Sequence, residues 1–222
     1  MSKGRKSGTP TEDRDTARQE RAAQKTAKQE EAARRRRQTA LRKQFTKTVV
    51  ILVLVGGVLA FFFLPRRGSY SPGGSGDVID GVQVYQNTTG HTLSPVDYPQ
   101  RPPAGGEHHP TWLNCGIYTE AVQSNYAVHS MEHGAVWVTY RPDLPAEQVE
   151  TLRSLMPSSY VVMSPYSGLP SPIVLSAWNR QLALDSPDDP RLPRFMEEYW
   201  RSQNVPEPGA LCTGGIDGEG RL

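Results

Sequence analysis

The sequence predicts an α+β fold, a small sheet with helices packed on one face, preceded by a single transmembrane helix and a basic N-terminal tail that is disordered or helical. Two observations define this division. The charges separate between the two ends of the chain, and an uncharged apolar run lies between them. The third observation is the order of the predicted segments after residue 77: strand, loop, strand, helix, strand, strand, helix.

The charge division isolates a tail that is unsuited to form a packed domain. Residues 1–47 carry a formal charge of +9 and residues 48–222 carry −7, although the whole chain has only +2. The tail is rich in helix-forming residues but has no apolar stripe to bury. Its basic residues either attract anionic lipid or only fix the orientation of a membrane segment. The negative balance of the remainder argues against nucleic acid as a partner.

Residues 48–64, TVVILVLVGGVLAFFFL, form the predicted membrane segment. These 17 uncharged residues fall within the usual length of a transmembrane helix. A retained anchor is favoured over a cleaved signal peptide, because a long polar segment precedes the run and no small-x-small cleavage site follows it. The basic residues before the run predict a single-pass protein of the plasma membrane with a cytoplasmic N-terminus (1–47), a flexible linker (65–76) and an extracytoplasmic domain (77–222).

Within this domain, hydrophobic periodicity predicts four strands and two helices. A Pro-rich segment, 94–110, is expected to cross the surface as an extended loop. Asp143 is the expected cap of the first helix. The predicted strands are 78–85, 135–140, 160–164 and 173–178, and the predicted helices are 145–156 and about 192–199.

The stretch YAVHSMEHGAVWVTYRP, residues 126–142, combines a candidate site with the strongest strand signal. His129 and His133 are one helical turn apart, so their imidazoles face the same way. Gly134 then lets the turn stop, because glycine adopts backbone conformations that other residues avoid. The run AVWVTY that follows predicts a strand covered on both faces.

The five histidines all lie in the predicted extracytoplasmic domain and suggest a site for copper or zinc, since imidazole suits both metals. The expected ligands are one histidine of the Pro-rich loop, His108 or His109, together with other residues near the strand: His129, His133 and Glu132. Met131 or Met163 would add a thioether. The alternative is structural, with His109 solvated and the helical histidines bonded to buried carbonyl groups.

HSMEH also fits the inverted zincin pattern H-x-x-E-H, in which two histidines hold zinc and the glutamate is a general base. Gly134 and the following strand shorten the helix that such a protease requires. A metal-dependent hydrolase is therefore the third of three hypotheses, and no catalytic residue is assigned.

The two cysteines, Cys115 and Cys212, lie near opposite ends of the predicted domain. An oxidising compartment favours a disulfide, which would close a loop of 97 residues. The competing interpretation makes Cys115 a thiolate ligand beside the histidines.

Four segments resemble a bacterial family catalogued as domain of unknown function 3105: GGEHHPTWLNCGIY, VHSMEHGAVWVTYRP, SPYSGLPSPIVLSAW and PEPGALC. The family's His-x-Pro-x-Trp pattern falls on His108, Pro110 and Trp112, and its VHxxEHG pattern falls on residues 128–134. The resemblance implies a membrane-tethered domain without an established activity and favours His108 over His109. It also places Met131 where leucine is usual, which weakens the thioether hypothesis.

These observations predict an envelope-exposed, membrane-tethered domain that binds copper or zinc through His108, His129, His133 and Glu132. The alternative is a cell-envelope interaction or structural module that contacts a protein or glycan through the Pro-rich loop. Metal analysis of the domain distinguishes them.

Overall fold

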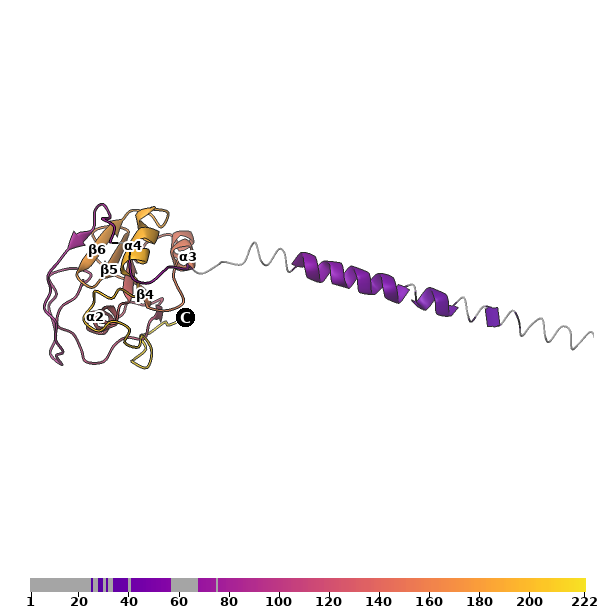
Figure 1. Cartoon of the computed structure of the whole chain (residues 1–222), viewed down its shortest axis with the longest axis horizontal. Coiled ribbons are helices and arrows are strands. Elements are labelled where there is room, and N and C mark those ends of the chain that lie inside the picture. Colours follow the sequence, from indigo (N-terminus) through magenta and orange to yellow (C-terminus); the bar gives the residue numbers. More distant parts are fainter. Residues whose placement is uncertain are drawn as a thin grey trace, which may run out of the picture. The chain divides into compact units, whose positions relative to one another are not determined.

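A computed structural model of the chain describes residues 25, 28–29, 31, 34–39, 41–56, 68–74 and 76–222 (Figure 1). The chain divides into two compact units, 1–64 and 65–222.

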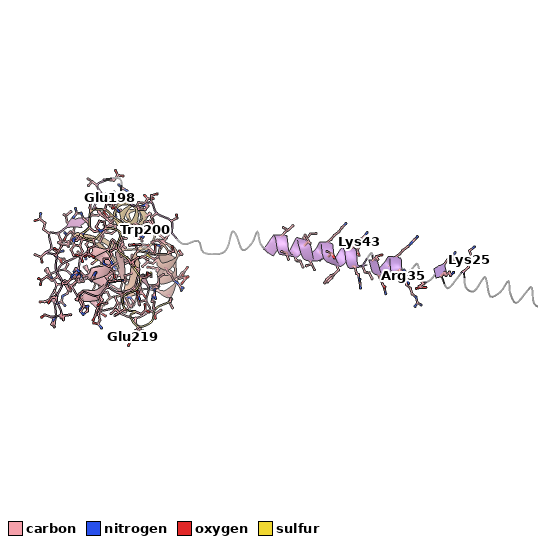
Figure 2. The ribbon with its side chains drawn as sticks, turned by 60° about the horizontal axis from the view of Figure 1, so that its bottom comes forward. Lys25, Arg35, Lys43, Glu198, Trp200 and Glu219 are labelled. Carbon is pink, nitrogen blue, oxygen red and sulfur yellow. A yellow bond between two sulfur atoms is a disulfide. The ribbon has the colours of Figure 1, made fainter. Side chains whose placement is uncertain are left out.

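In the first unit, residues 34–39 and 41–56 are helical and exposed. Basic side chains such as Arg35 and Lys43 project from this helical segment in Figure 2, and Arg35 forms an ion pair with Glu31 at 2.7 Å. Within the described residues, no helix combines the length and apolar character that crossing a membrane requires. Residues 57–64 of the predicted membrane segment lie outside the described residues.

The second unit contains a six-stranded mixed sheet in the order β1-β6-β5-β3-β4-β2. β3 pairs in parallel with β4 and antiparallel with β5, so it occupies the middle of the sheet. The strands are β1 Gln83–Val84, β2 Gly116–Ile117, β3 Val136–Tyr140, β4 Val161–Pro165, β5 Ile173–Ala177 and β6 Arg180–Leu184.

The predicted strands at 135–140, 160–164 and 173–178 are confirmed as β3, β4 and β5. Every residue of β3 is buried, as expected for a strand covered on both faces. The strand predicted at 78–85 is reduced to the two residues of β1. β2 and β6 were not predicted.

The helices cover both faces of the sheet, so the prediction that they pack on one face is wrong. Because side chains alternate along a strand, Val136 and Val138 join one core, while Trp137 between them joins another. The first core contains α3 (Ala146–Ser154) and α4 (Arg191–Tyr199). The second contains α2 (Ser124–Glu132) and the disulfide. Figure 1 shows α2 apart from α3 and α4.

α3 and α4 confirm the two predicted helices, but the expected cap of α3 is wrong. The residue before α3 is Pro145, and no side chain caps the helix start. Pro145 occupies the N-cap position itself, with φ −53° and ψ 137°, so Asp143 lies two residues before the position where a side chain could cap the helix. Upstream, Tyr70 of the predicted linker donates a hydrogen bond to the Leu155 carbonyl at 2.9 Å.

The C-terminal segment is joined to the loop before β2. Cys115 and Cys212 form a disulfide, as the sequence predicted for an oxidised chain. The Cys115 N–H also donates to the Cys212 carbonyl at 2.8 Å, and the Ile216 N–H donates to the Trp112 carbonyl at 3.0 Å. These bonds bring residues after α4 beside α2, where the histidines lie.

Candidate metal centre

α2 separates apolar and site residues onto two sides of one short helix. Ala127, Val128 and Met131 are fully buried in the core around Trp137. His129 and Glu132 lie within the helix, and His133 is its C-terminal cap. The helix is longer than the single turn expected, with nine residues, but it ends before Gly134, whose φ of +98° suits glycine.

The Pro-rich loop brings His108 to this helix. The Leu113 N–H donates to the Tyr126 carbonyl at 3.0 Å, and the Ser130 hydroxyl donates to the Leu113 carbonyl at 2.6 Å. These bonds dock the segment directly after the loop along α2, and His108 is completely buried.

His91 joins the cluster through a backbone bridge to His108. The Thr92 N–H donates to the His108 carbonyl at 2.8 Å, and the His108 N–H donates to the Gly90 carbonyl at 3.0 Å. The imidazole centroids of His91 and His108 are 4.9 Å apart. No role was predicted for His91, because nothing in the local sequence around it indicates this bridge.

Backbone carbonyls fix the rings of three histidines. Nδ1 of His108 lies 2.8 Å from the Gly106 oxygen, Nδ1 of His129 lies 2.7 Å from the His109 oxygen, and Nδ1 of His133 lies 2.7 Å from the Leu211 oxygen. A carbonyl oxygen only accepts, so each Nδ1 carries the proton and donates. In the neutral ring, Nε2 then has a free lone pair. Metal-binding histidines commonly have this arrangement, with one nitrogen held by a carbonyl or carboxylate.

Four side chains bring potential ligand atoms close together. Among the described residues, one group of His91, His108, His129 and Glu132 has ligand atoms within 4.8 Å of one another. A Glu132 carboxylate oxygen lies 2.8 Å from Nε2 of His108 and 3.4 Å from Nε2 of His91. Three of the four residues are buried, and His91 opens the group to solvent with 42% of its side chain exposed.

The electrostatics leave Glu132 and His129 in the forms that metals bind. Burial disfavours the charged ring and lowers the pKa of His129 to about 4, with the His109 carbonyl opposing the shift in part. Burial also acts to raise the pKa of Glu132, but the hydrogen bond with His108 and the surrounding imidazoles outweigh it, so this pKa lies below its usual value. At neutral pH, His129 is therefore neutral and Glu132 is ionised.

His133 lies beside the first group but points to a different carboxylate. Its ring centroid is 4.6 Å from that of His129, which confirms that the two imidazoles face the same way. Its Nε2 lies 3.3 Å from a carboxylate oxygen of Glu207. His129, His133 and Glu207 form a second group within 4.8 Å. Glu207 was not predicted, since it follows α4 in a separate segment of the sequence.

The remaining ligand candidates lie elsewhere. Nδ1 of His109 accepts a hydrogen bond from the Thr111 N–H, and its ring lies against Tyr126. Met131 and Met163 are fully buried in the two opposite cores, which gives their thioethers a packing role. Cys115 is in the disulfide, so the thiolate interpretation is wrong for the oxidised chain. Among the described residues, the two groups that converge offer imidazole nitrogens and carboxylate oxygens.

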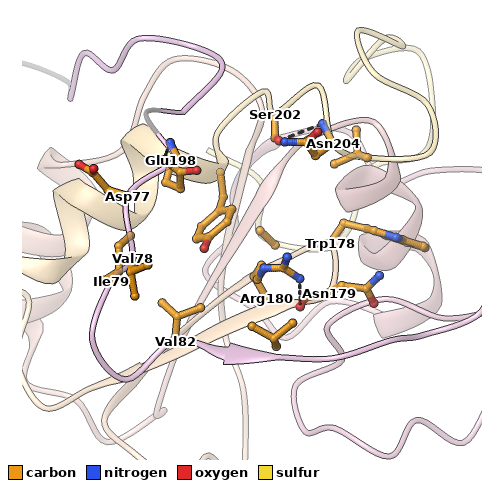
Figure 3. A pocket seen from close by; sticks show the side chains of 15 residues that line it. Asp77, Val78, Ile79, Val82, Trp178, Asn179, Arg180, Glu198, Ser202 and Asn204 are labelled. Carbon is orange, nitrogen blue, oxygen red and sulfur yellow. Dashed lines mark hydrogen bonds between the residues drawn. The ribbon is translucent and has the colours of Figure 1, made fainter.

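A surface cavity of about 410 Å³ has Trp178 among its lining residues (Figure 3). The indole lines the cavity beside Arg180, and it meets the His108 ring edge-on at a centroid distance of 5.9 Å. The cavity does not contain the histidines. Trp178 therefore contacts both the cavity and the His108 ring, while the side chains of His91 and Glu207 are partly exposed to solvent.

The segment that builds this cluster coincides with a sequence family. A family described as a protein of unknown function, DUF3105, matches residues 91–214, more than half of the chain. The chain belongs to this family. The DUF3105 region begins at His91 and ends two residues after Cys212, so it includes every histidine and both cysteines. No match was found among curated proteins or among solved structures.

Proposed function

We propose that this DUF3105 domain binds one transition-metal ion, copper or zinc, through Nε2 of three histidines and the carboxylate of Glu132. The histidines are His91, His108 and His129. The convergence of these four ligand atoms within 4.8 Å carries the proposal. His91 takes the place that the sequence analysis gave to His133, since Glu132 lies among the other three rings.

The contact between His108 and Glu132 supports a cation at this point. Because Nδ1 of His108 donates to Gly106, its Nε2 faces the carboxylate without a second proton in the neutral ring. Two acceptors 2.8 Å apart repel unless a proton or a metal ion lies between them. A divalent ion can take this position because metal ligands are deprotonated when they bind.

The spacing suits an ion of this class after a small adjustment. Two ligands of a tetrahedral zinc ion, each about 2.0–2.1 Å from the metal, are about 3.3 Å apart. Nε2 of His91 and the Glu132 oxygen are already 3.4 Å apart. Imidazole and carboxylate ligands suit zinc and copper, and the absence of a converging sulfur among the described residues makes copper(I) the weaker candidate.

The domain is further proposed to lie outside the plasma membrane, tethered by residues 48–64, with the basic tail in the cytoplasm facing anionic lipid. The apolar run and the preceding basic residues support the tether. The disulfide supports an oxidising compartment. Membrane fractionation of cells that express the chain, followed by protease treatment of intact cells, tests both points. Recovery of the chain in the soluble fraction, or a domain that the protease does not cleave in intact cells, would contradict this placement.

Metal analysis tests the binding proposal directly. The full chain is purified without a polyhistidine tag, and bound metal is measured by mass spectrometry before and after titration with Zn(II) or Cu(II). One ion per chain is expected to survive dialysis. Glu132→Gln keeps the shape of the side chain but removes its charge, and is expected to weaken binding at least about tenfold. Glu150→Gln in α3, on the other face of the sheet, is the matched control.

Metal-free protein whose melting temperature does not change on adding either metal would refute the proposal. The same imidazole bonds to carbonyl groups would then serve a structural network in an envelope interaction module.

A further inference from the structure

The second histidine group lies beside the first and shares one residue with it. His129, His133 and Glu207 have ligand atoms within 4.8 Å of one another. The distance from Nε2 of His133 to the Glu207 oxygen is 3.3 Å, close to the separation of about 3.3 Å for two ligands of one tetrahedral ion. The proposed mononuclear site does not use His133 or Glu207.

We propose that the cluster holds two transition-metal ions, each bound by two imidazoles and one carboxylate. His91, His108 and Glu132 bind the first ion. His129, His133 and Glu207 bind the second. This inference rests on the proposed metal binding and extends it to a dinuclear centre.

His129 determines how the two ions share the cluster. Its Nδ1 is committed to the His109 carbonyl, so only Nε2 can bind a metal. When one ion is present, Nε2 of His129 completes a set of four donors with His91, His108 and Glu132. When a second ion arrives, His129 joins His133 and Glu207. The first ion then keeps three protein ligands and an open coordination position, as metal ions in catalytic sites do.

The backbone holds Glu207 beside the helix end. Its N–H donates to the Glu132 carbonyl at 3.2 Å, so the two carboxylate-bearing residues are directly linked. Four residues later, the Leu211 carbonyl accepts the Nδ1 proton of His133, and the disulfide of Cys212 follows. The side chain of Glu207 is 47% exposed, which gives an ion access from solvent.

Charge makes the two ions unequal. The two carboxylates neutralise only half of the charge on two divalent ions, and neighbouring ions repel. The first ion has four donors and the second has three, one of which it must take from the first. The second equivalent is therefore expected to bind more weakly and to change the spectrum of the first.

Titration of the full chain with Cu(II) tests this inference, with bound metal counted by mass spectrometry and the ions followed by electron paramagnetic resonance. The first equivalent is expected to give the signal of an isolated Cu(II) ion. The second is expected to reduce that signal and produce the half-field line of a coupled pair. Glu207→Gln is expected to remove only the second equivalent. Glu150→Gln is the control and is expected to bind both.

The outcomes separate the two proposals. A wild-type chain that binds no metal refutes the mononuclear site and the dinuclear centre together. A wild-type chain that saturates at one ion refutes only the dinuclear centre. The dinuclear centre is also refuted if Glu207→Gln still binds two coupled ions, because Glu207 would then not be a ligand of the second ion. It is refuted as well if this variant loses both equivalents, because Glu207 would then belong to a single shared site.

Discussion

At the scale of single residues, the site depends on which ring nitrogen each histidine presents. The Gly106, His109 and Leu211 carbonyls hold the Nδ1 atoms of three rings, which directs their Nε2 atoms toward the carboxylates. This anchoring is the structural role that the sequence analysis weighed against metal binding. The geometry makes the two roles compatible, because a metal ligand uses the nitrogen that the carbonyl does not.

His91 and His109 provide a matched pair of histidines for testing the site. His91→Ala removes a partly exposed ligand and is expected to weaken binding of the first ion at least about tenfold. His109→Ala leaves the backbone carbonyl that anchors His129, so its metal affinity is expected to stay near that of the wild type. Competition with a chelator of known affinity measures both. Equal affinity in the two variants would place His91 outside the site.

The sequence predicts the part of the site that is local along the chain. The four-residue spacing places His129 beside His133, and the family pattern selects His108. The contributions of His91 and Glu207 depend on contacts between distant segments, a backbone bridge at Gly90 to Thr92 and a hydrogen bond to the last residue of α2. Residue spacing carries no signal for such contacts, so these two ligands emerge only from the fold.

At the scale of elements, the long buried strands were predictable and the short or turn-dependent ones were not. A β-branched and aromatic run predicts β3, and this composition fits a strand buried on both faces. β6 follows β5 after a tight turn in which Asn179 has a φ of +60°. Asparagine tolerates this conformation, so Trp178-Asn179 was a usable hairpin signal. The two-residue strand β2 depends on its parallel pairing with β4 and has no sequence signal of its own.

The start of α4 shows how one carboxylate supports an element. Asp189 accepts hydrogen bonds from the Arg191 N–H at 2.9 Å and from its guanidinium at 2.7 Å. The side-chain bond to Arg191 is the main cause that holds the pKa of Asp189 below its usual value. Asp189→Asn keeps an acceptor for the N–H but loses the charge of the ion pair with Arg191, and is expected to lower the free energy of unfolding by up to about 1 kcal/mol at neutral pH.

The pH dependence of this variant follows from the direction of the pKa shift. A carboxyl group whose pKa is lower in the folded state stabilises the fold fully above its unfolded pKa of about 3.9, and loses this effect as the pH falls through the folded value. The difference between wild type and Asp189→Asn is therefore expected to narrow below about pH 4. Denaturant unfolding across this range measures it, with the exposed Asp188→Asn as control. A difference that widens in acid would contradict the assignment.

At the scale of the whole molecule, the sheet separates two kinds of core. The face covered by α3 and α4 is built from aliphatic and aromatic side chains. The face covered by α2 contains the disulfide and supports the histidine cluster. The prediction of helices on one face rested on the two helices at 145–156 and 192–199, since residues 126–133 predicted no more than a helical turn. α2 reaches nine residues, and its apolar side has a sheet face of its own to cover.

The disulfide couples the stability of this second face to its metal chemistry. Cys115 and Cys212 close a loop of 97 residues, so reduction is expected to lower the free energy of unfolding by up to about 4–5 kcal/mol. The same bond anchors the segment that carries Leu211 and Glu207, the partners of His133. Reduction is therefore expected to weaken the second Zn(II) equivalent more than the first, whose ligands lie on α2 and in the segment 91–108.

The paired variant Cys115→Ser and Cys212→Ser separates the bond from any effect of the reductant on the metal. It is expected to match the reduced wild type in its unfolding midpoint, measured by thermal and denaturant unfolding, and to show no further change with reductant. Zn(II) is the probe for binding, since it undergoes no redox reaction with thiols. If the variant keeps the wild-type affinity for both equivalents, the segment after α4 holds Glu207 without the disulfide, and the proposed coupling is wrong.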